Sequence, residues 1–424
     1  MSSATERSEF RLGWKTLLAG ICGVCCGASP IPFNVIGFLF EPLNAEFGWG
    51  RGEISIGITI FGIVASFLAP FYGWMADRYG VRPVALFSLA AFGVCFGAFA
   101  FTPSSIWGFY ALWLLLGLVG IGSTPVTFSR AVNMWFFRNR GLALGLLLLG
   151  TSLAALIVPR LAVWAIGDFG WRGMFLVIAC LPLFVALPLG LLWFREPHDE
   201  ERPPEIATSN GGQVAGMTLQ QALRDRRFWL IFASIACIAF AYGGAHIHMP
   251  SIILDHGFTP ELAATIMMIV GLGILSGRVI TGLLLDRFWA GFVAFPLLCM
   301  PAAACFMLMG TATDFLLVGT AAFMLGFAAG AESDLIAYLA GRYFGMAHYG
   351  KIYGMLYLPF GLFSAISPTV YGFTRDGTGS YDPILMVASG LFVVGGTLLL
   401  FLGRYPERFP SADPEPSDAA LEAA

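Results

Sequence analysis

Apolar stretches long enough to cross a lipid bilayer fill most of this sequence and constrain its fold more than any other feature. A spanning helix needs about 20 apolar residues, because its backbone polar groups have to be paired inside the lipid. Only 12% of the residues are charged while 58% are hydrophobic, which leaves too few charges to cover a water-facing surface. Twelve such stretches, each bounded by charges or by Gly/Pro turns, lie at about residues 16–42, 52–76, 82–102, 106–134, 141–166, 172–194, 228–254, 260–285, 289–310, 314–338, 351–373 and 383–403. We therefore predict an all-α membrane protein with twelve transmembrane helices, which excludes a soluble enzyme, a disordered chain and a secreted disulfide-bonded scaffold.

The distribution of Lys and Arg predicts the orientation of these spans. If the N-terminus is cytoplasmic, 17 of the 23 basic residues fall on the cytoplasmic side. Cytoplasmic loops carry an excess of Lys and Arg, so this bias places both termini in the cytoplasm and the chain in the cell's inner (plasma) membrane. Three basic residues fall on the outer side, Arg51, Arg172 and Arg375, and three fall inside spans, Arg130, Arg160 and Arg278.

A long polar stretch divides the spans into six and six. We predict an N-terminal six-helix bundle at residues 1–194, a cytoplasmic linker at 195–227, a C-terminal six-helix bundle at 228–403 and a cytoplasmic tail at 404–424. Within the linker, Thr218–Arg227 is expected to form a short amphipathic surface helix that begins at a Thr cap. Glycine pairs inside the spans, Gly93/Gly97, Gly141/Gly145 and Gly326/Gly330, fit close helix packing.

The two halves repeat at an offset of 209 residues. Gly48 and Gly257 share that offset, as do Gly145 and Gly354. The same offset relates Gly73-Trp-Met-Ala-Asp77-Arg78 to Gly282-Leu-Leu-Leu-Asp286-Arg287. Two parallel six-span repeats are a known transporter plan, in which the substrate binds near the bilayer midplane between the halves. The repeat therefore predicts two pseudo-repeated bundles around a central site.

The run Gly73-Trp-Met-Ala-Asp77-Arg78-Tyr-Gly80-Val-Arg82 resembles the signature loop of the major facilitator superfamily, and the resemblance extends from about residue 14 to 405. Four stretches resemble the monocarboxylate transporter and oxalate–formate exchanger branch: Phe47-Gly48-Trp49-Gly50-Arg51, Trp135-Phe136-Phe137-Arg138-Asn-Arg140-Gly141-Leu-Ala, Gly170-Trp171-Arg172 and Arg278-x-x-x-Gly282-x-x-x-Asp286. The resemblance implies that Arg278 binds the substrate carboxylate. The chain departs from animal monocarboxylate carriers at Ile274, where they have an aspartate, and from oxalate exchangers in having only Lys351, at the start of its eleventh span.

The repeated loop motif predicts a conformational lock. An aspartate at a helix end can cap a neighbouring helix or pair with an arginine across the two halves, and such a contact breaks when the halves rock. The alternative is a turn that merely sets topology. The predicted lock residues are Gly73, Asp77, Arg78, Gly80, Arg82, Gly282, Asp286 and Arg287.

Arginines at membrane depth are costly and are functional candidates by default. Arg278 precedes Asp286 by eight residues, which places it about 12 Å inside the cytoplasmic edge. We expect its planar guanidinium to bind a substrate carboxylate, and the alternative is an ion pair with a distant acid. Arg130 and Arg160 are further anion-binding candidates, for which helix packing and snorkelling to the surface are the respective alternatives.

Other polar residues in the spans complete the predicted site. Glu332, Asp334 and His248 are candidates for proton coupling, because buried acids and histidines titrate near neutral pH. Asn34, Ser29, Tyr242 and His246 are candidate hydrogen-bonding partners of the substrate, at bends expected in the first and seventh spans. A structural ion pair or a polar residue lining a pore remains the alternative for each.

Together these features predict a secondary active transporter that moves a small organic anion by alternating access. The expected substrate is a monocarboxylate, with an aromatic one among the options, and the coupling is proton symport or anion exchange. An exporter of a neutral or cationic compound and a non-transporting ligand sensor are the alternatives. Because the only lysines are Lys15 and Lys351, no Walker lysine exists. We expect no enzymatic activity, cofactor, metal or nucleic acid, eight reduced cysteines, and function as a monomer.

Overall fold

The computed structural model describes residues 2–136, 139–197, 216–285, 287–310, 314–345 and 348–406; the side chains of residues 2–8, 77, 140, 141, 333, 334, 337 and 350 lie outside that description. Within these ranges the chain forms helices and no β-strand. The first part contains α1 (Ser2–Cys25), α2 (Ile31–Val35), η1 (Ile36–Phe38), α3 (Phe40–Phe47), α4 (Arg51–Tyr79), α5 (Val81–Ala98), η2 (Phe99–Phe101), α6 (Ile106–Gly120), η3 (Ile121–Ser123), α7 (Pro125–Trp135), α8 (Arg140–Cys180), η4 (Leu181–Ala186) and α9 (Leu187–Trp193). The second part contains α11 (Leu219–Arg224), α12 (Arg226–Asp255), α13 (Pro260–Leu285), α14 (Ala290–Met307), α15 (Phe315–Phe344), α16 (Tyr349–Thr378) and α17 (Asp382–Leu400).

These helices account for twelve membrane crossings, as predicted. Nine stretches in the described part of the chain are long and apolar enough to span a bilayer. One of them, Leu142–Trp193, is 52 residues long and turns at Gly170, whose φ of 70° is a left-handed conformation that favours glycine. It therefore crosses twice, and the helices before Arg51 and helix α16 supply the remaining two crossings.

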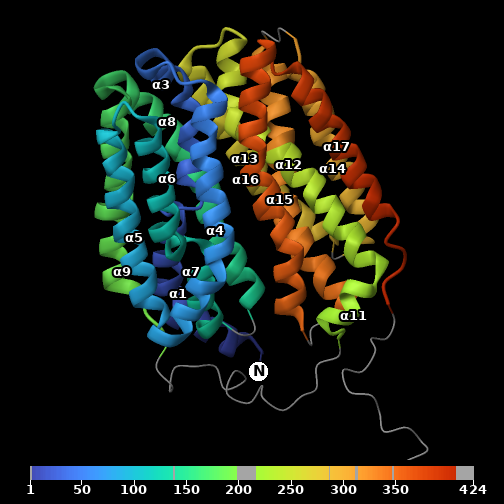
Figure 1. Ribbon diagram of the computed structural model, residues 1–424. Helices are drawn as coiled ribbons and strands as arrows, with labels where there is room; N and C mark the ends of the chain where they lie inside the picture. The colour runs from blue at the N-terminus through green and yellow to red at the C-terminus, as the bar shows by residue number, and fades with distance from the viewer. Residues whose placement is uncertain are drawn as a thin grey trace, which may run out of the picture.

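The helices gather into two groups that stand side by side (Figure 1). The first group, α1 to α9, packs around aromatic residues such as Phe92, Phe99 and Trp113. The second group, α11 to α17, has a separate core that includes Phe228 and Phe392. Arg195 and Gly216 border the undescribed stretch 198–215 at one end of the molecule, which we call the linker end; the opposite end is the far end.

The short helix predicted near the linker is confirmed as α11. Thr218 accepts a hydrogen bond from the Gln221 N–H at 3.3 Å, and the Gln221 side chain accepts one from the Thr218 N–H at 2.8 Å. This reciprocal capping box pairs two backbone donors that a free helix start leaves unpaired. The remainder of the predicted linker and most of the predicted tail lie outside the described residues.

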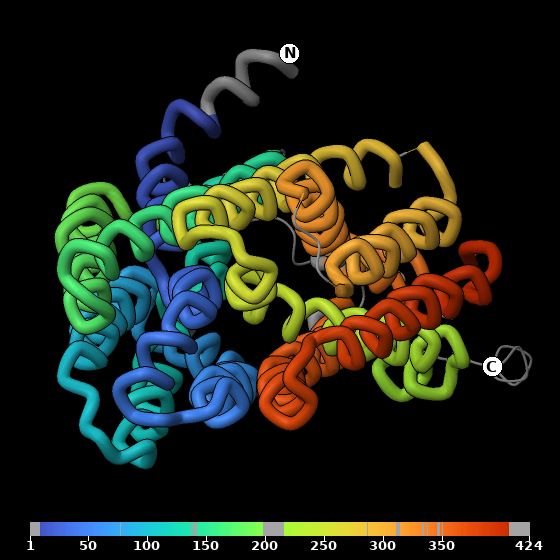
Figure 2. The backbone as a smooth tube through the Cα atoms, turned by 90° about the horizontal axis from the view of Figure 1, so that it is seen from above, coloured from blue at the N-terminus to red at the C-terminus, as the bar shows by residue number. Residues whose placement is uncertain are grey.

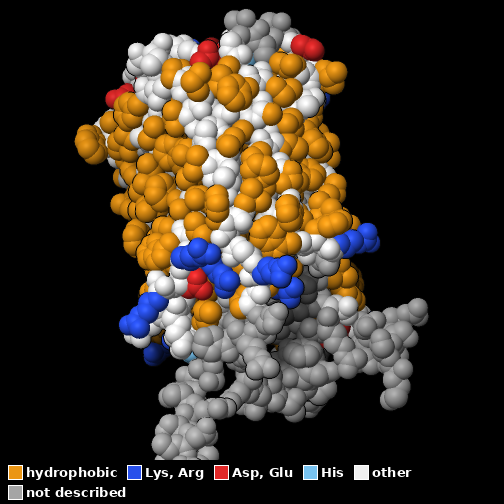
Figure 3. All heavy atoms as spheres, turned by 90° about the vertical axis from the view of Figure 1, so that its right-hand side faces the viewer, with side chains coloured by type: hydrophobic (Ala, Val, Ile, Leu, Met, Phe, Trp, Pro, Cys, Tyr) orange, Lys and Arg blue, Asp and Glu red, His pale blue; other side chains and the backbone are white. Residues whose placement is uncertain are grey.

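The outer surface carries an apolar belt that suits contact with lipid. Large side chains on it are strongly exposed, among them Phe67, Trp107 and Phe292 at 71%, 76% and 72%. Figure 3 shows this belt around the middle of one face, with Lys and Arg side chains gathered toward the linker end. A belt of this width with charges displaced to its edges is what a bilayer requires of a multi-pass protein.

Two seams join the groups, and Figure 2 shows both: α4 beside α16, and α8 beside α13. Glycines let the helices approach closely along the first seam. A Cβ added to Gly62 would lie 2.6 Å from the Ala365 Cβ, and one added to Gly361 would lie 2.5 Å from the Ser66 hydroxyl. Along the second seam, a Cβ added to Gly271 would lie 3.2 Å from Ala155.

The seams open toward the linker end. Gly354 continues the seam face of α16 one or two turns below Gly361, yet a Cβ added there would meet nothing within 4 Å. The same holds for Gly282 on α13 and for Gly145 on α8. The close packing expected at Gly145 is therefore wrong for this arrangement, because the groups diverge where it lies.

Candidate functional site

Helix α13 carries Arg278 directly beside α15. The predicted packing role of Gly326 and Gly330 is confirmed, because a Cβ on Gly326 would collide with the Val270 carbonyl and one on Gly330 would lie 2.9 Å from the Arg278 nitrogen. Backbone contact of this kind needs residues without side chains. Arg278 itself is half-buried, and its guanidinium interacts electrostatically with the hydroxyl of Tyr357 on α16.

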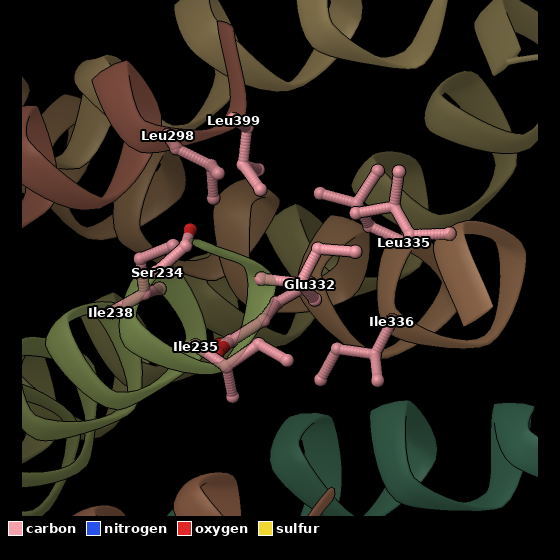
Figure 4. A pocket seen from close by; sticks show the side chains of 10 residues that line it. Ser234, Ile235, Ile238, Leu298, Glu332, Leu335, Ile336 and Leu399 are labelled. Atoms are coloured by element: carbon pink, nitrogen blue, oxygen red, sulfur yellow. The ribbon is translucent and has the colours of Figure 1, made fainter. Parts of the chain in front are cut away.

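Glu332 lies half a turn beyond Gly330 on α15 and is 4% exposed. It points into a small pocket between α12 and α15 that apolar residues line, among them Ile235, Leu335 and Ile336 (Figure 4). Within the described part of the chain, its Oε1 atom has no hydrogen-bond partner. The carboxyl interacts electrostatically with the hydroxyls of Tyr242 and Tyr357. A buried acid in such surroundings is able to exchange a proton, since the neutral form avoids the cost of a buried charge. The side chain of Asp334, the second predicted acid, lies outside the described residues.

Tyr242 and His246 form a pair on α12. The tyrosine hydroxyl lies 3.2 Å from His246 Nδ1, the two rings stack at 5.3 Å, and both residues are partly exposed. Helix α12 continues through Tyr242 as one element, with Pro250 near its far end, so the bend expected at this point is not formed as a helix break.

The first helix does break where its prolines predicted. After α1 ends at Cys25 the chain turns, and α2 begins at Ile31. Ser123 of η3 accepts a hydrogen bond from the freed Ala28 N–H at 3.1 Å. Asn34 is buried and donates to the Pro30 carbonyl at 2.8 Å, while its Oδ1 has no partner among the described residues. Ser29 is partly exposed within the turn.

The other two membrane arginines lie in different places. Arg130 on α7 donates to the Gly73 carbonyl of α4 at 2.7 Å, inside the first group and near the loop motif. Arg160 lies at the α8–α13 seam, where its Nη1 approaches the Thr265 hydroxyl at 3.4 Å. The structure therefore separates both from Arg278: one toward the linker end of α4, the other across the second seam.

The loop motif is bound into the first group. Gly80 has a φ of 90°, which explains why a glycine stands there. The next N–H, of Val81, donates to the Glu196 carboxylate, and Arg82 donates to the Leu191 carbonyl at 2.7 Å. Arg78 lies over the Trp74 ring at 5.7 Å. The Asp77 side chain and all of Asp286 lie outside the described residues; Arg287 is exposed just beyond α13.

At the far end, residues that the sequence had not singled out as a site join the two groups. Asp255 of α12 accepts from Arg51 of α4 at 2.9 Å and from Arg375 of α16 at 2.9 Å. Asp376 of α16 accepts from the backbone N–H groups of Arg51 and Gly52 at 3.2 and 2.8 Å, and so caps the N-terminus of α4 from the other group.

His248 belongs to this far-end cluster. Its Nε2 lies 2.8 Å from the Pro368 carbonyl and its Nδ1 lies 2.8 Å from the Tyr381 hydroxyl. A carbonyl accepts only, so Nε2 carries the hydrogen and Nδ1 accepts from Tyr381, whose oxygen in turn accepts from Arg51 at 3.1 Å. The ring also stacks on Phe40 of the first group at 4.7 Å. His246 and His248 thus lie in two separate environments.

Comparison with known proteins identifies the class. A twelve-crossing fold of two joined groups, apolar outside and with ionisable residues inside, is the architecture of a membrane transporter. The family model described as Major Facilitator Superfamily matches residues 22–368, and the chain belongs to that superfamily.

Curated relatives cover almost the whole chain. Monocarboxylate transporter 11 of Homo sapiens is 25% identical over 95% of this chain and 85% of its own length. Monocarboxylate transporter 13 of Bos taurus is 25% identical over 100% of this chain and 96% of its own length. The 3-(3-hydroxy-phenyl)propionate transporter of Escherichia coli (strain K12) is 24% identical over 97% of this chain and 98% of its own length. The chain is accordingly a multi-pass membrane transporter and not an enzyme, as its sequence predicted.

Proposed function

We propose that this protein is a secondary transporter of a small monocarboxylate and that Arg278 binds the carboxylate. The observation that carries the proposal is the position of Arg278: half-buried at membrane depth on α13, facing the Tyr357 hydroxyl of α16. A guanidinium presents a rigid fork of donors that matches the two oxygens of a carboxylate. The printed names of the relatives, monocarboxylate transporters and a phenylpropionate transporter, support the same substrate class.

Proton symport is the coupling mode that we favour, with Glu332 as the proton carrier. Its carboxyl is buried close to Tyr357, which Arg278 also faces, so a proton on Glu332 and an anion on Arg278 neutralise each other's charge within one site. Asp334 remains the second candidate for this role, and His248 is assigned instead to the far-end cluster. Tyr242, His246, Asn34 and Ser29 supply polar neighbours for the substrate in this proposal.

We further assign the linker end to the cytoplasm, so that the described arrangement is open inward. The 17 basic residues predicted there support this orientation. The bundles then comprise residues 1–194 and 228–403, joined by the cytoplasmic linker, and the Asp77 and Asp286 motifs act as locks when the inner end closes. Impermeant labelling of single cysteines introduced at Ser105 and at Met217 tests the orientation: only the first should react from outside intact cells.

The central test is substitution of Arg278. Arg278→Ala should leave folded protein in the membrane but lose carboxylate binding and uptake, because removing a charged partner in a desolvated site costs about 2–5 kcal/mol, roughly thirty- to several thousand-fold in affinity. Arg278→Lys keeps the charge without the fork and should retain weak function. Thermal-shift binding to a carboxylate panel and uptake into proteoliposomes measure both. Near wild-type affinity in a stable Arg278→Ala protein would remove the assignment.

Glu332→Gln separates the coupling mode from binding. A glutamine resembles the protonated acid, so this variant should still exchange labelled for unlabelled substrate across the vesicle membrane. It should no longer accumulate substrate in response to a pH gradient. Accumulation that matches the wild type would instead indicate anion exchange or coupling through Asp334.

A further inference from the structure

Four aromatic rings form a continuous row along one face of α16. Tyr349, Tyr353, Tyr357 and Phe360 follow one another at spacings of four, four and three residues, which places them on one side of a helix. Their ring centroids lie 5.6, 5.7 and 5.0 Å apart in that order. These separations are those of aromatic rings in favourable contact. We call this row the α16 ladder.

The ladder begins at the linker end and stops where the first seam closes. Its last ring, Phe360, immediately precedes Gly361, the position at which α16 approaches Ser66 of α4. Beside the lower rings, Gly354 faces open space. The ladder therefore follows the region between the groups that stays open toward the linker end (Figure 1).

Tyr357 differs from its neighbours in the ladder. Tyr349, Tyr353 and Phe360 pack partly against the core of the second group, whereas Tyr357 is 38% exposed. Its hydroxyl interacts electrostatically with both Arg278 and Glu332. One edge of this ring thus meets the charged pair while its neighbour Phe360, at 5.0 Å, extends an apolar surface away from that pair.

We propose that Tyr357 and Phe360 form a ring-binding subsite that makes this transporter prefer aryl-substituted monocarboxylates. The assignment rests on the proposed function, because it needs the carboxylate to be held at Arg278. A carboxylate on the guanidinium leaves the rest of the molecule next to the Tyr357 ring, where an aryl group stacks or meets it edge-on. A saturated ring of the same size gains the apolar burial but not the aromatic geometry.

A matched pair of ligands tests the subsite: 3-phenylpropionate and 3-cyclohexylpropionate, which share the carboxylate, the chain and nearly the same volume. In purified full-length protein, the wild type should bind the phenyl compound about three- to tenfold more tightly, the range expected of one aromatic pair. Tyr357→Leu should bring this ratio close to one. Tyr357→Phe keeps the ring and should keep the preference. Phe292→Leu, on the lipid-facing side of α14 at 72% exposure, is the control and should not alter the ratio.

The outcomes separate the subsite from the proposed function. A wild-type ratio near one, or a ratio that survives Tyr357→Leu, would overturn the subsite while carboxylate binding stands. If wild-type protein binds neither compound nor short alkyl carboxylates such as butyrate, the carboxylate assignment fails and the subsite fails with it. A ratio lost equally in Tyr357→Phe would move the preference from the ring to the hydroxyl and would also overturn the proposal.

Discussion

The two ends of helix α4 are held by opposite halves of the molecule. At the far end, its first N–H groups are capped by Asp376 and its Arg51 pairs with Asp255, both from the second group. At the linker end, its Gly73 carbonyl is bound by Arg130 and the following loop by Glu196, both from the first group. One rigid helix therefore moves with its own group at one end while its other end is released or captured. The contrast teaches that the closed end is maintained by contacts between the groups, and the open end by contacts within one.

Glycine substitutions should break this contrast most strongly. Gly62→Leu inserts a side chain against the Ala365 Cβ, which would lie 2.6 Å from even the first added carbon. Overpacking of this kind costs about 3 kcal/mol, or about a 150-fold shift in population, so the far end should open and transport should fall to background. Spin labels at Ser105 and Thr378 would report the separation of the groups at that end.

The same stripe supplies an opposite variant and a control. Gly354→Leu fills a position that is open now and becomes crowded only when the linker end closes, so it should narrow the distance distribution to the far-end-closed state. Gly390 also faces open space but lies on α17, away from both seams, and Gly390→Leu should leave the distribution unchanged. Equal effects of Gly62→Leu and Gly354→Leu would contradict the asymmetry of the seams.

Loss of the shared carboxylate should have an intermediate effect. Asp255→Asn removes the charge that holds Arg51 and Arg375 together, while the isosteric amide preserves packing. Hydrogen bonds to charged groups contribute about 1.5–3 kcal/mol, and this site is only 25% exposed. The far-end-open fraction should rise by roughly ten- to 150-fold. Asp314→Asn, whose carboxylate caps its own helix, serves as the matched control and should show no change.

The sequence predicted the fold well because the length and polarity of each apolar run are local properties. It also predicted the break in the first helix, since prolines at positions 30 and 32 remove backbone donors there. It did not predict that α8 passes through Gly170 within a single hydrogen-bonded element, because a glycine at a boundary reads equally well as a loop.

The candidate site was harder to predict, because it depends on contacts between distant segments. Arg278 and Glu332 both stood out as charges in lipid, yet their closeness follows from the glycines that bring α13 and α15 into backbone contact. The far-end cluster was overlooked although it left a signal. The three arginines that oppose the positive-inside bias, Arg51, Arg172 and Arg375, all form ion pairs, so basic residues on the outer side deserved to be read as structural.

The third of those ion pairs gives the smallest expected effect. Glu46 accepts from Arg172 at 2.7 Å and from the Trp171 indole at 2.7 Å, all within the first group. These donors hold the pKa of the Glu46 carboxyl below its usual value, Arg172 contributing most. A lowered pKa stabilises the fold above the ordinary pKa of a glutamate, about 4.3, and that contribution is lost as the pH falls through the lowered value.

Glu46→Gln should therefore lower the thermal midpoint slightly at pH 7, and the difference from wild type should shrink as the pH falls below about 4. Because both partners lie in the same group, the spin-label distances should not move. A shift in those distances would show that this pair, too, takes part in closing the far end.

The cap that Asp376 places on α4 gives the closed end the character of a latch at a water's edge. A helix start that gives up a carboxylate at the protein surface can take water in its place, so the lost hydrogen bonds are replaced instead of being left unmade. Release then requires little net enthalpy, and the resistance to opening falls mainly on the glycine-to-alanine contact deeper along the same seam. Dissolved ions that weaken the carboxylate's pull should quicken the first step of opening without loosening the seam beneath it.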